Sequence, residues 1–368
     1  MFDCNNGAAS SAYQGSGRVS RRAVLAGGTA SLLAAATASR VKAAAEELFS
    51  KPLSPLLAEL YERAKPESQV TIWAAGTGNL FWLDGTFVKR FPAIKLNSLG
   101  ARDVGTRIIA ESRAGRNVAD VWSHSLGGSL QVQERGIFDK VDWASLGVNP
   151  NDLLFDGKGA PQHNFVYTPI FLNSRLAETD RPRKWTDLTE NPFWHNKMVS
   201  STFHLPRVSA FLALEWGEER TIEWLRMMLE KQKTLITTGE GTDFLTSGER
   251  ILAPGESTGT AFRFTRNGLE MGHQVMDIVP ATQFVLCKPK AAPHPNAANL
   301  LLAWLLSPEG KELNETVAGW SDIRSNSASP LRREIAAAGS KILFEDTDTM
   351  QKRADYYKNF SDVVRGLR

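Results

Sequence analysis

Apolar runs alternate with amphipathic segments in the first third of the chain. The runs Val70–Ala75, Ile94–Leu99 and Val118–Trp122 are short and rich in β-branched and aromatic residues, which predicts three buried strands. Apolar side chains spaced three and four apart predict helices at 80–91 and 104–115 between those strands. This order is typical of a parallel sheet with right-handed crossovers. Ligands of such α/β sheets bind at the carboxyl ends of the strands.

A second α/β unit is predicted between two extended apolar segments, 165–173 and 274–287. The residues between them carry their own helical patterns and a predicted strand at 260–264, and they are numerous enough for a domain. The chain therefore leaves a first lobe, builds a second and returns, which gives two crossings and a hinge. After the return, residues 295–307 are apolar on nearly every side, which predicts a deeply buried helix.

These patterns predict an α/β fold with two separately packed lobes. At 368 residues the chain is long enough for two domains of ordinary size. We expect a cleavable segment at 1–45, a first lobe at 46–165, a second lobe at 166–279, a return to the first lobe at 280–330 and a C-terminal helical tail at 331–368.

The first 45 residues resemble a bacterial twin-arginine (Tat) export signal. Arg21 and Arg22 precede an uncharged run of Ala, Gly, Thr and Ser that is too weakly apolar for a transmembrane helix. Arg40 and Lys42 then lead to three alanines that end at Ala45, a small-residue cleavage site. A disordered tail, or a start codon assigned too early, is the alternative. The resemblance implies export by the Tat translocase, cleavage near Ala45 and a periplasmic location.

Removal of that segment changes the charge of the chain. The formal net charge is +3, and residues 1–45 supply +4 of it from five basic residues and one acidic residue, so the remainder is near −1. No basic field remains to favour nucleic acid or an anionic membrane. Cys4 lies in the removed segment. Cys287, the other cysteine, sits in an apolar run, which predicts a buried thiol without a disulfide.

Short motifs spread along the chain carry a family resemblance. In order they are Phe87–Lys95, Arg107–Glu111, Ala114-Gly115-Arg116, Ala119-Asp120-Val121, Leu172-Asn173-Ser174, Trp185-Thr186-Asp187-Leu188, Ser247-Gly248-Glu249, Ala291-Ala292-Pro293-His294-Pro295-Asn296-Ala297-Ala298 and Leu305-Leu306-Ser307-Pro308-Glu309-Gly310. Each motif is weak alone, but together they cover nearly the whole chain after the signal. The chain resembles the extracellular solute-binding proteins of bacterial ABC importers, family 1, a group that includes ferric-iron, phosphonate, thiamine and polyamine binders.

The resemblance implies a type II periplasmic binding protein fold. A small solute would be held in a cleft between the lobes and passed to membrane permease subunits, with no catalysis, no cofactor and no resident metal, by a protein that acts as a monomer. Ferric-iron members use adjacent tyrosines in the second lobe, where this chain has the tyrosine-free stretch 260–266, and Tyr356-Tyr357 lies in the tail. We therefore expect a small polar solute other than ferric iron, and Arg263 and Arg266 favour an anion or a zwitterion. A chemoreceptor-coupled binding module shares the same fold and stays open.

Candidate ligand contacts follow from the positions of loops and strand ends. Backbone N–H groups of the turn at 76–79 suit an anion, and the residues after the third strand lie at a ligand-binding edge. Trp82 could close over the ligand or pack in the core. Two arginines could bind a carboxylate or phosphate with their planar guanidinium groups. The candidates are Gly76, Thr77, Gly78, Asn79, Trp82, Ser123, His124, Asn173, His204, Arg207 and Arg263.

An exported serine hydrolase is the alternative from another class. The run Gly255-Glu256-Ser257-Thr258-Gly259 matches the nucleophile-elbow pattern, and Asp277 and His294 follow Ser257 in the right order for a triad. The elbow requires a strand before the serine and a helix after it, whereas residues 260–264 are predicted as strand. The spacings typical of zinc, dithiol and dinucleotide sites are absent from the sequence. We therefore favour binding without catalysis.

Overall fold

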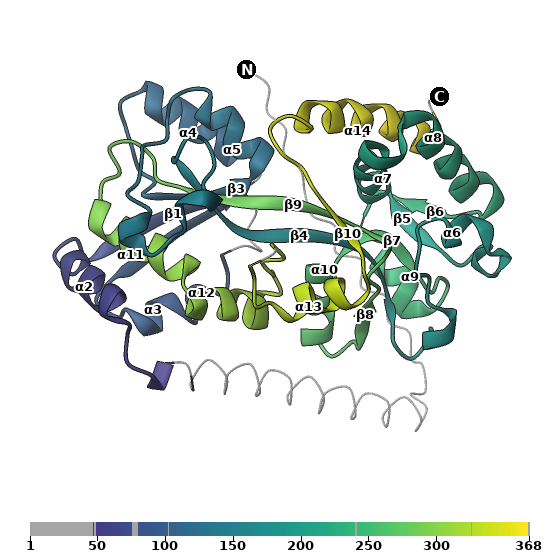
Figure 1. Cartoon of the computed structure of the whole chain (residues 1–368), viewed down its shortest axis with the longest axis horizontal. Helices are drawn as coiled ribbons and strands as arrows, with labels where there is room; N and C mark the ends of the chain where they lie inside the picture. The colour runs from purple at the N-terminus through teal and green to yellow at the C-terminus, as the bar shows by residue number, and fades with distance from the viewer. Residues whose placement is uncertain are drawn as a thin grey trace, which may run out of the picture.

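Two lobes lie side by side and share two long strands (Figure 1). The computed structural model describes residues 47, 49–75, 80–101, 103–239, 241–324 and 326–366. The shared strands are β4 (Gly159–Leu172) and β9 (Ile278–Cys287), which pair antiparallel. They overlap most of the two extended segments predicted as crossings, 165–173 and 274–287, and they lie next to each other as expected.

The first lobe is built on the predicted parallel strands. β1 (Gln69–Ala75) pairs with β2 (Lys95–Ala101) and with β3 (Val121–Ser125), both parallel. β1 is buried over five consecutive residues, which explains its unbroken apolar sequence. The helices of this lobe are α2 (Pro55–Ala64), α3 (Phe87–Arg90), α4 (Val104–Arg113), α5 (Leu126–Gln133), α11 (Pro295–Leu306) and α12 (Pro308–Leu313).

Two predictions for the first lobe have different outcomes. The helix expected at 80–91 is wrong for most of its length: the chain there forms turns, and only the four residues of α3 are helical. The buried helix predicted at 295–307 is confirmed as α11, in which eight residues are buried.

The second lobe surrounds the other ends of β4 and β9. Its own strands are β5 (Val199–Ser201), β6 (Leu235–Thr237), β7 (Ala253–Ser257) and β8 (Met271–His273). β7 and β8 both pair antiparallel with β4. The helices are α6 (Asp187–Glu190), α7 (His204–Trp216), α8 (Glu218–Arg226), α9 (Thr242–Ser247) and α10 (Thr258–Arg266).

The two lobes together also contain short 3-10 or π turns. They lie at Ala144–Leu146, Pro150–Asp152, Glu178–Asp180, Pro192–Trp194, Met227–Lys231 and Asn314–Ala318.

The strand predicted at 260–264 is wrong, because those residues belong to α10. The Oγ atom of Ser257 accepts a hydrogen bond from the backbone N–H of Thr260 at 3.0 Å, which caps the helix at its start. The cap outweighs the strand preference of the aromatic and β-branched residues that follow it.

Eight of the described strands form one sheet, in the order β2-β1-β3-β9-β4-β7 with β10 beside β9 and β8 beside β4, and β5 and β6 form a separate pair. The lobes are nevertheless packed separately, because β4 and β9 are long enough to have different neighbours at each end. One hydrophobic cluster contains α11 and the first-lobe strands, and another contains α7, Trp185 and Trp224 of the second lobe. The two-lobed expectation therefore holds for the cores, while the hydrogen-bonded sheet runs through both lobes.

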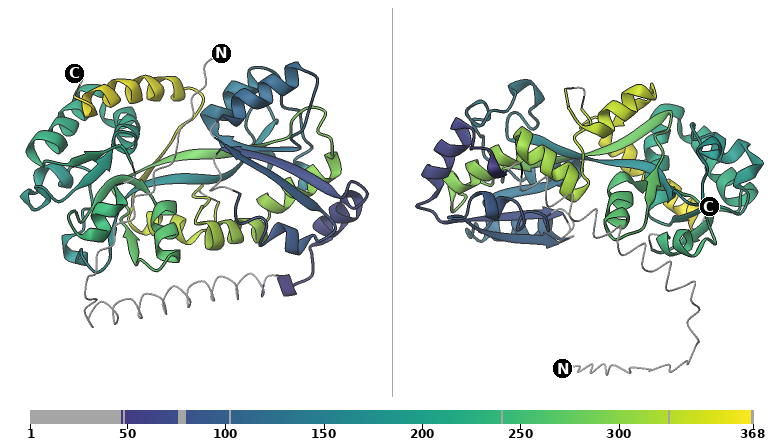
Figure 2. Two further views of the ribbon diagram at one scale, coloured as in Figure 1. Left: turned by 180° about the vertical axis from the view of Figure 1, so that it is seen from behind. Right: turned by 90° about the horizontal axis from the view of Figure 1, so that it is seen from below.

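The C-terminal segment returns to the second lobe. It contains α13 (Pro330–Ala337), β10 (Lys341–Phe344) and α14 (Met350–Val364). β10 pairs parallel with β9, and α14 packs against α7 (Figure 2). The predicted tail is thus helical in part, but it also contributes a strand and a third connection between the lobes. Within the described residues, no helix has both the length and the apolar character needed to cross a membrane.

Candidate functional site

The carboxyl ends of strands from the two lobes point toward each other. β3 runs antiparallel to β9 and ends with Ser125 opposite Phe284, which in turn lies opposite His163 of β4. β7 runs antiparallel to β4 and ends with Ser257 opposite Tyr167. His163 and Tyr167 are four residues apart, so the two strand ends face each other across about 13 Å of β4. This is the position at which α/β proteins bind their ligands.

The first-lobe edge carries Ser123 and His124, as predicted. Ser123 is buried, and its Oγ donates to Oε1 of Gln162 at 2.7 Å. The imidazole of His124 stacks on Trp122 with a centroid distance of 5.3 Å. It also packs against Gly128 of α5, where an added Cβ would lie 2.1 Å from Nδ1 of His124. Burial lowers the pKa of His124 to about 4, so its ring is neutral at pH 7.

The second-lobe edge carries His204 at the start of α7. Its backbone N–H donates to Oγ of Ser201 at 2.9 Å, which fixes the first turn of the helix. Its Nδ1 lies 2.7 Å from Oε1 of Glu256, whose side chain is 1 % exposed. Neither carboxylate oxygen of Glu256 has a hydrogen bond of good geometry with a described residue, and the same is true of Oγ1 of Thr168, the residue opposite Glu256 on β4. An unsatisfied buried carboxylate is costly unless a ligand or water meets it.

Aromatic rings form the floor between the two edges. His163 of β4 is 3 % exposed and stacks on Phe284 and Trp320, with centroid distances of 4.7 and 5.8 Å. Both of its ring nitrogens lack a hydrogen-bond partner among the described residues. Burial lowers the pKa of His163 to about 3. Trp320 also covers Gly259 in α10, where an added Cβ would lie 2.4 Å from the indole ring.

Several predicted contacts lie elsewhere. The expectation that Trp82 closes over a ligand is corrected: its ring is 2 % exposed and stacks on Trp304 in the first-lobe core at 5.5 Å. Asn173 follows the outer end of β4, six residues and about 20 Å along the strand from Tyr167. Its backbone N–H donates to the backbone carbonyl of Glu270. The turn formed by Gly76, Thr77, Gly78 and Asn79 lies outside the described residues.

The two predicted arginines make contacts within their own lobe. The guanidinium of Arg207 lies 3.8 Å from the ring centre of Phe203, and its Nη1 is 3.4 Å from the hydroxyl of Tyr167. Arg263 is exposed on α10, about a turn and a half into the helix, with its guanidinium 5.2 Å from the ring of Phe264. His204 lies at the start of α7, one turn before Arg207, whereas Arg263 lies within α10.

Sequence reasoning missed Glu256, Thr168, His163 and Trp320. The signal available was Glu256 itself, a charged residue in the run Ala253–Ser257, which the structure shows to be a fully buried strand. Such residues are rarely buried without a partner or a function. The sequence could not show that Thr168 lies opposite it, because strand pairing over 88 positions leaves no local pattern.

The serine-hydrolase alternative is not supported by the geometry. The required order of strand and helix is present around Ser257, but its backbone is extended, with φ −128° and ψ 156°. Its hydroxyl is fully buried and contacts Thr260 rather than a histidine. Asp277 accepts from the backbone of Trp185 in the second lobe, whereas His294 binds Asp120 in the first. No triad is assembled from these residues.

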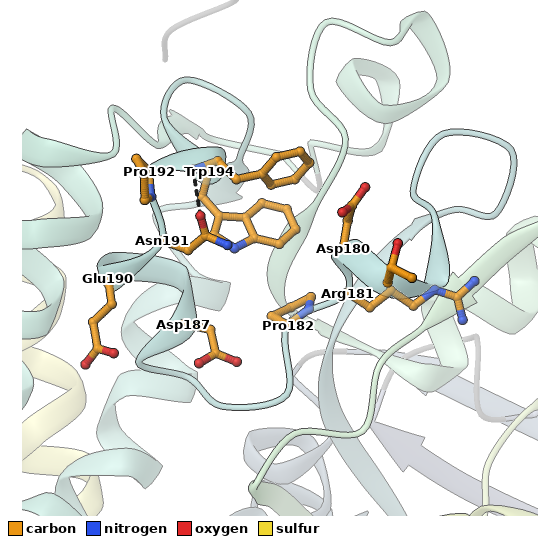
Figure 3. Close-up of a pocket in the computed structure, with 10 residues that line it drawn as sticks. Asp180, Arg181, Pro182, Asp187, Glu190, Asn191, Pro192 and Trp194 are labelled. Carbon is orange, nitrogen blue, oxygen red and sulfur yellow. Dashed lines mark hydrogen bonds between the residues drawn. The ribbon is translucent and has the colours of Figure 1, made fainter.

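A surface cavity of about 470 Å³ lies in the second lobe, lined by residues from Thr179 to Trp194 (Figure 3). Asp180, Asp187 and Glu190 are among the residues that line it, and it is separate from the facing strand ends. Across the described part of the chain, no three His, Cys, Asp or Glu side chains gather in a way that could hold a metal ion.

Comparison with solved structures identifies the fold. Iron-bound HitA from Pseudomonas aeruginosa matches with a TM-score of 0.60 and 18% identity over 78% of this chain and 99% of its own. A substrate-binding protein of an ABC transporter from Agrobacterium tumefaciens matches with a TM-score of 0.64 and 13% identity over 82% of this chain and 97% of its own. The chain has the fold of a two-lobed periplasmic binding protein.

A third match with this binding-protein fold is the Bordetella ferric binding protein, with a TM-score of 0.59 and 19% identity over 81% of this chain and 98% of its own. At these identities the likeness extends to the fold and not to the ligand. Scans of protein-family models and of curated proteins find no match. The fold places the facing strand ends, with Ser123 and His124 on one side and His204 and Glu256 on the other, at the boundary between the lobes.

Proposed function

We propose that this chain is the solute-binding component of an ABC importer, which captures a small polar solute between its lobes and performs no bond chemistry. The observation that carries the proposal is the pair of facing strand ends, where the ring nitrogens of His163, Oγ1 of Thr168 and Oε2 of Glu256 are buried without a hydrogen-bond partner among the described residues. The binding-protein fold supports the same reading. Closure of the lobes around the hinge strands would bury the solute and present a closed form to membrane permease subunits.

The solute is proposed to be a zwitterion. Glu256 and His204 at the second-lobe edge offer a carboxylate and an imidazole, which suit a positively charged or hydrogen-bond-donating group. An anionic group would be met by backbone N–H groups at the starts of α5 and α7. Arg207 and Arg263 contact Phe203 and Phe264, and Arg266, which with Arg263 carried the expectation of an anion, donates to the backbone carbonyl of Val317.

Iron is named for five of the matching structures, three of which are ferric-iron-binding proteins, so ferric iron must be tested as the solute. Ferric iron is a hard cation that favours several oxygen ligands, and the tyrosine-free start of α10 offers hydroxyls and backbone only.

Export of the chain is part of the proposal. Residues 1–45 lie outside the described structure, and their resemblance to a Tat signal supports a periplasmic mature protein that begins near Glu46, which we propose acts as a monomer. N-terminal sequencing of the protein recovered from periplasm tests this. A mature terminus near Glu46 is expected, and recovery of intact Met1 from the cytoplasm would contradict it.

A thermal-shift screen of the mature chain tests binding itself. The panel should contain zwitterionic amino acids and betaines, simple carboxylates, inorganic phosphate and ferric citrate. A solute present at 100 times its Kd should stabilise the protein by about 2.7 kcal/mol. We expect a zwitterion to raise Tm and ferric citrate to leave it unchanged.

Variants then locate the site. Glu256→Gln and His204→Ala should each weaken binding of the stabilising solute about tenfold or more, because each removes a buried hydrogen-bonding group. Asn173→Ala is the matched control, because Asn173 lies at the far end of β4 and should leave affinity unchanged. A shift produced only by ferric citrate would overturn the proposed solute. Equal affinity in all three variants would overturn the proposed site.

A further inference from the structure

The C-terminal segment is fastened to the second lobe along most of its length. Tyr356, Phe360, Val363 and Val364 of α14 are buried in the second-lobe core beside α7. β10 adds four backbone pairings to β9, and the buried carboxylate of Glu345 forms an ion pair with Arg353. These contacts make α14 move with the second lobe as one body.

The first residue of α14 nevertheless touches the first lobe. Sδ of Met350 lies 3.1 Å from the position that a Cβ on Gly127 would occupy. Gly127 belongs to the first turn of α5, directly after the end of β3. Figures 1 and 2 show the start of α14 beside α5 in views from opposite sides. A glycine at this position lets the methionine reach the helix backbone.

The loop before α14 holds Met350 in place. Oδ1 of Asp346 accepts hydrogen bonds from the backbone N–H groups of Thr349 at 2.7 Å and Asp348 at 3.1 Å, and from Oγ1 of Thr349 at 2.6 Å. These bonds lower the pKa of Asp346, so the carboxylate remains ionised and the turn persists at neutral pH. The thioether is therefore presented to α5 by an ordered turn.

The contact lies next to the candidate site. Gly128, the neighbour of Gly127, supports the ring of His124 at the first-lobe edge. In the first turn of α5, Met350 therefore lies against Gly127, and the ring of His124 lies against Gly128. Any rotation that separates the lobes must pull Met350 away from α5, because α14 is fixed to the other lobe.

We propose that the C-terminal segment is a strap whose Met350–Gly127 contact holds the lobes together and sets the balance between open and closed forms. The proposal rests on the two-lobed motion in the proposed function, but not on the identity of the solute. A strap that favours the closed form lowers the cost of closure for any solute and slows its release.

Cross-linking tests the contact in the mature chain without any solute. The pair Gly127→Cys and Met350→Cys should form an intramolecular disulfide in mild oxidant, because the two positions are in direct contact. Native Cys287 is fully buried and will not compete. The matched control pairs Gly127→Cys with Gln351→Cys, an exposed neighbour on the same helix, and should cross-link at least tenfold more slowly. Equal rates for the two pairs would overturn the contact.

Small-angle scattering of single variants tests the function of the strap. Met350→Ala should raise the radius of gyration of the solute-free chain, whereas Lys358→Ala, on the exposed face of α14, should not. An unchanged radius in Met350→Ala, despite efficient cross-linking of the cysteine pair, would show that the contact does not hold the lobes and would overturn the proposal. If no solute binds while Met350→Ala opens the chain, the strap stands and the proposed function fails.

Discussion

Nδ1 of His294 lies 2.9 Å from Oδ2 of Asp120, a carboxylate with no exposed surface. The same carboxylate accepts hydrogen bonds from the backbone N–H groups of Thr71 and His294, both at 2.7 Å. One side chain therefore joins β1, the segment that leads into β3, and the start of α11. Asp120 and His294 belong to two of the motifs that carried the family resemblance, and their role here is to lock the returning chain onto the first lobe.

Loss of this carboxylate should destabilise the first lobe strongly. Asp120→Ala leaves two buried N–H groups and an imidazole without their acceptor, so the free energy of unfolding should fall by about 3–5 kcal/mol. Urea denaturation of the mature chain measures the change. Asp84→Ala, on an exposed residue, should stay within about 0.5 kcal/mol of the parent. A loss below about 1 kcal/mol in Asp120→Ala would refute the proposed lock.

Acidification should destabilise the protein through two buried histidines. The pKa values of His163 and His124 are lowered to about 3 and about 4 by burial, whereas histidine in the unfolded chain titrates near 6.5. Their stabilising effect is therefore complete above pH 6.5 and is lost as the pH falls toward 4, because only the unfolded chain takes up the protons. Each of the two histidines should lower the free energy of unfolding by about 2 kcal/mol between pH 7 and pH 5.

The variant His163→Gln isolates one of these contributions. Its loss of stability between pH 7 and pH 5 should be about 2 kcal/mol smaller than that of the parent. Above pH 7 the two stability curves should run parallel, which serves as an internal control against a simple packing defect. Identical pH dependence below pH 6.5 would contradict the buried, neutral state of His163.

Gly259→Ala should disturb the floor of the site. The new Cβ would lie 2.4 Å from the indole of Trp320, so the ring must move away from His163. We expect a loss of about 1–3 kcal/mol, as for other overpacked positions, together with weaker solute binding. Gly239→Ala is the matched control, since nothing lies within 4 Å of its added Cβ. Equal melting temperatures for the two variants would contradict the close packing of Trp320 on α10.

Ser257 should behave as a helix cap and not as a nucleophile. Ser257→Ala removes the acceptor for the N–H of Thr260 and should cost about 1 kcal/mol, whereas Ser257→Gly should cost only a few tenths. Thermal denaturation measures both. The parent should show no hydrolysis of p-nitrophenyl acetate above that of Ser257→Ala. Turnover that depends on Ser257 would revive the hydrolase alternative.

Sequence patterns predicted the framework well where burial was continuous. β1 and α11 stand out because their side chains are apolar on every face, and the buried thiol of Cys287 follows from the apolar run around it. The local preference for strand gave a wrong prediction at 260–264, because the hydroxyl of Ser257 caps a helix that includes these residues. The prediction was wrong again at 80–91, where an amphipathic spacing forms turns rather than a helix.

The site was only partly predictable. The rule that ligands meet the ends of parallel strands led to Ser123 and His124, and the loop before α7 led to His204. Trp82 and Asn173 were misplaced because spacing does not show which way a side chain or a strand end points. Glu256 gains its position from a strand, β4, that is distant in sequence, and only the folded chain shows that pairing.

Small-angle X-ray scattering of the mature chain with and without the solute found in the thermal screen tests the central claim most directly. We expect the radius of gyration of the parent to decrease when the solute is saturating, and the double variant Glu256→Gln with His204→Ala to show no decrease at the same concentration. A solute that binds the parent tightly while the radius stays constant, or that closes the double variant equally well, would contradict capture between the facing strand ends.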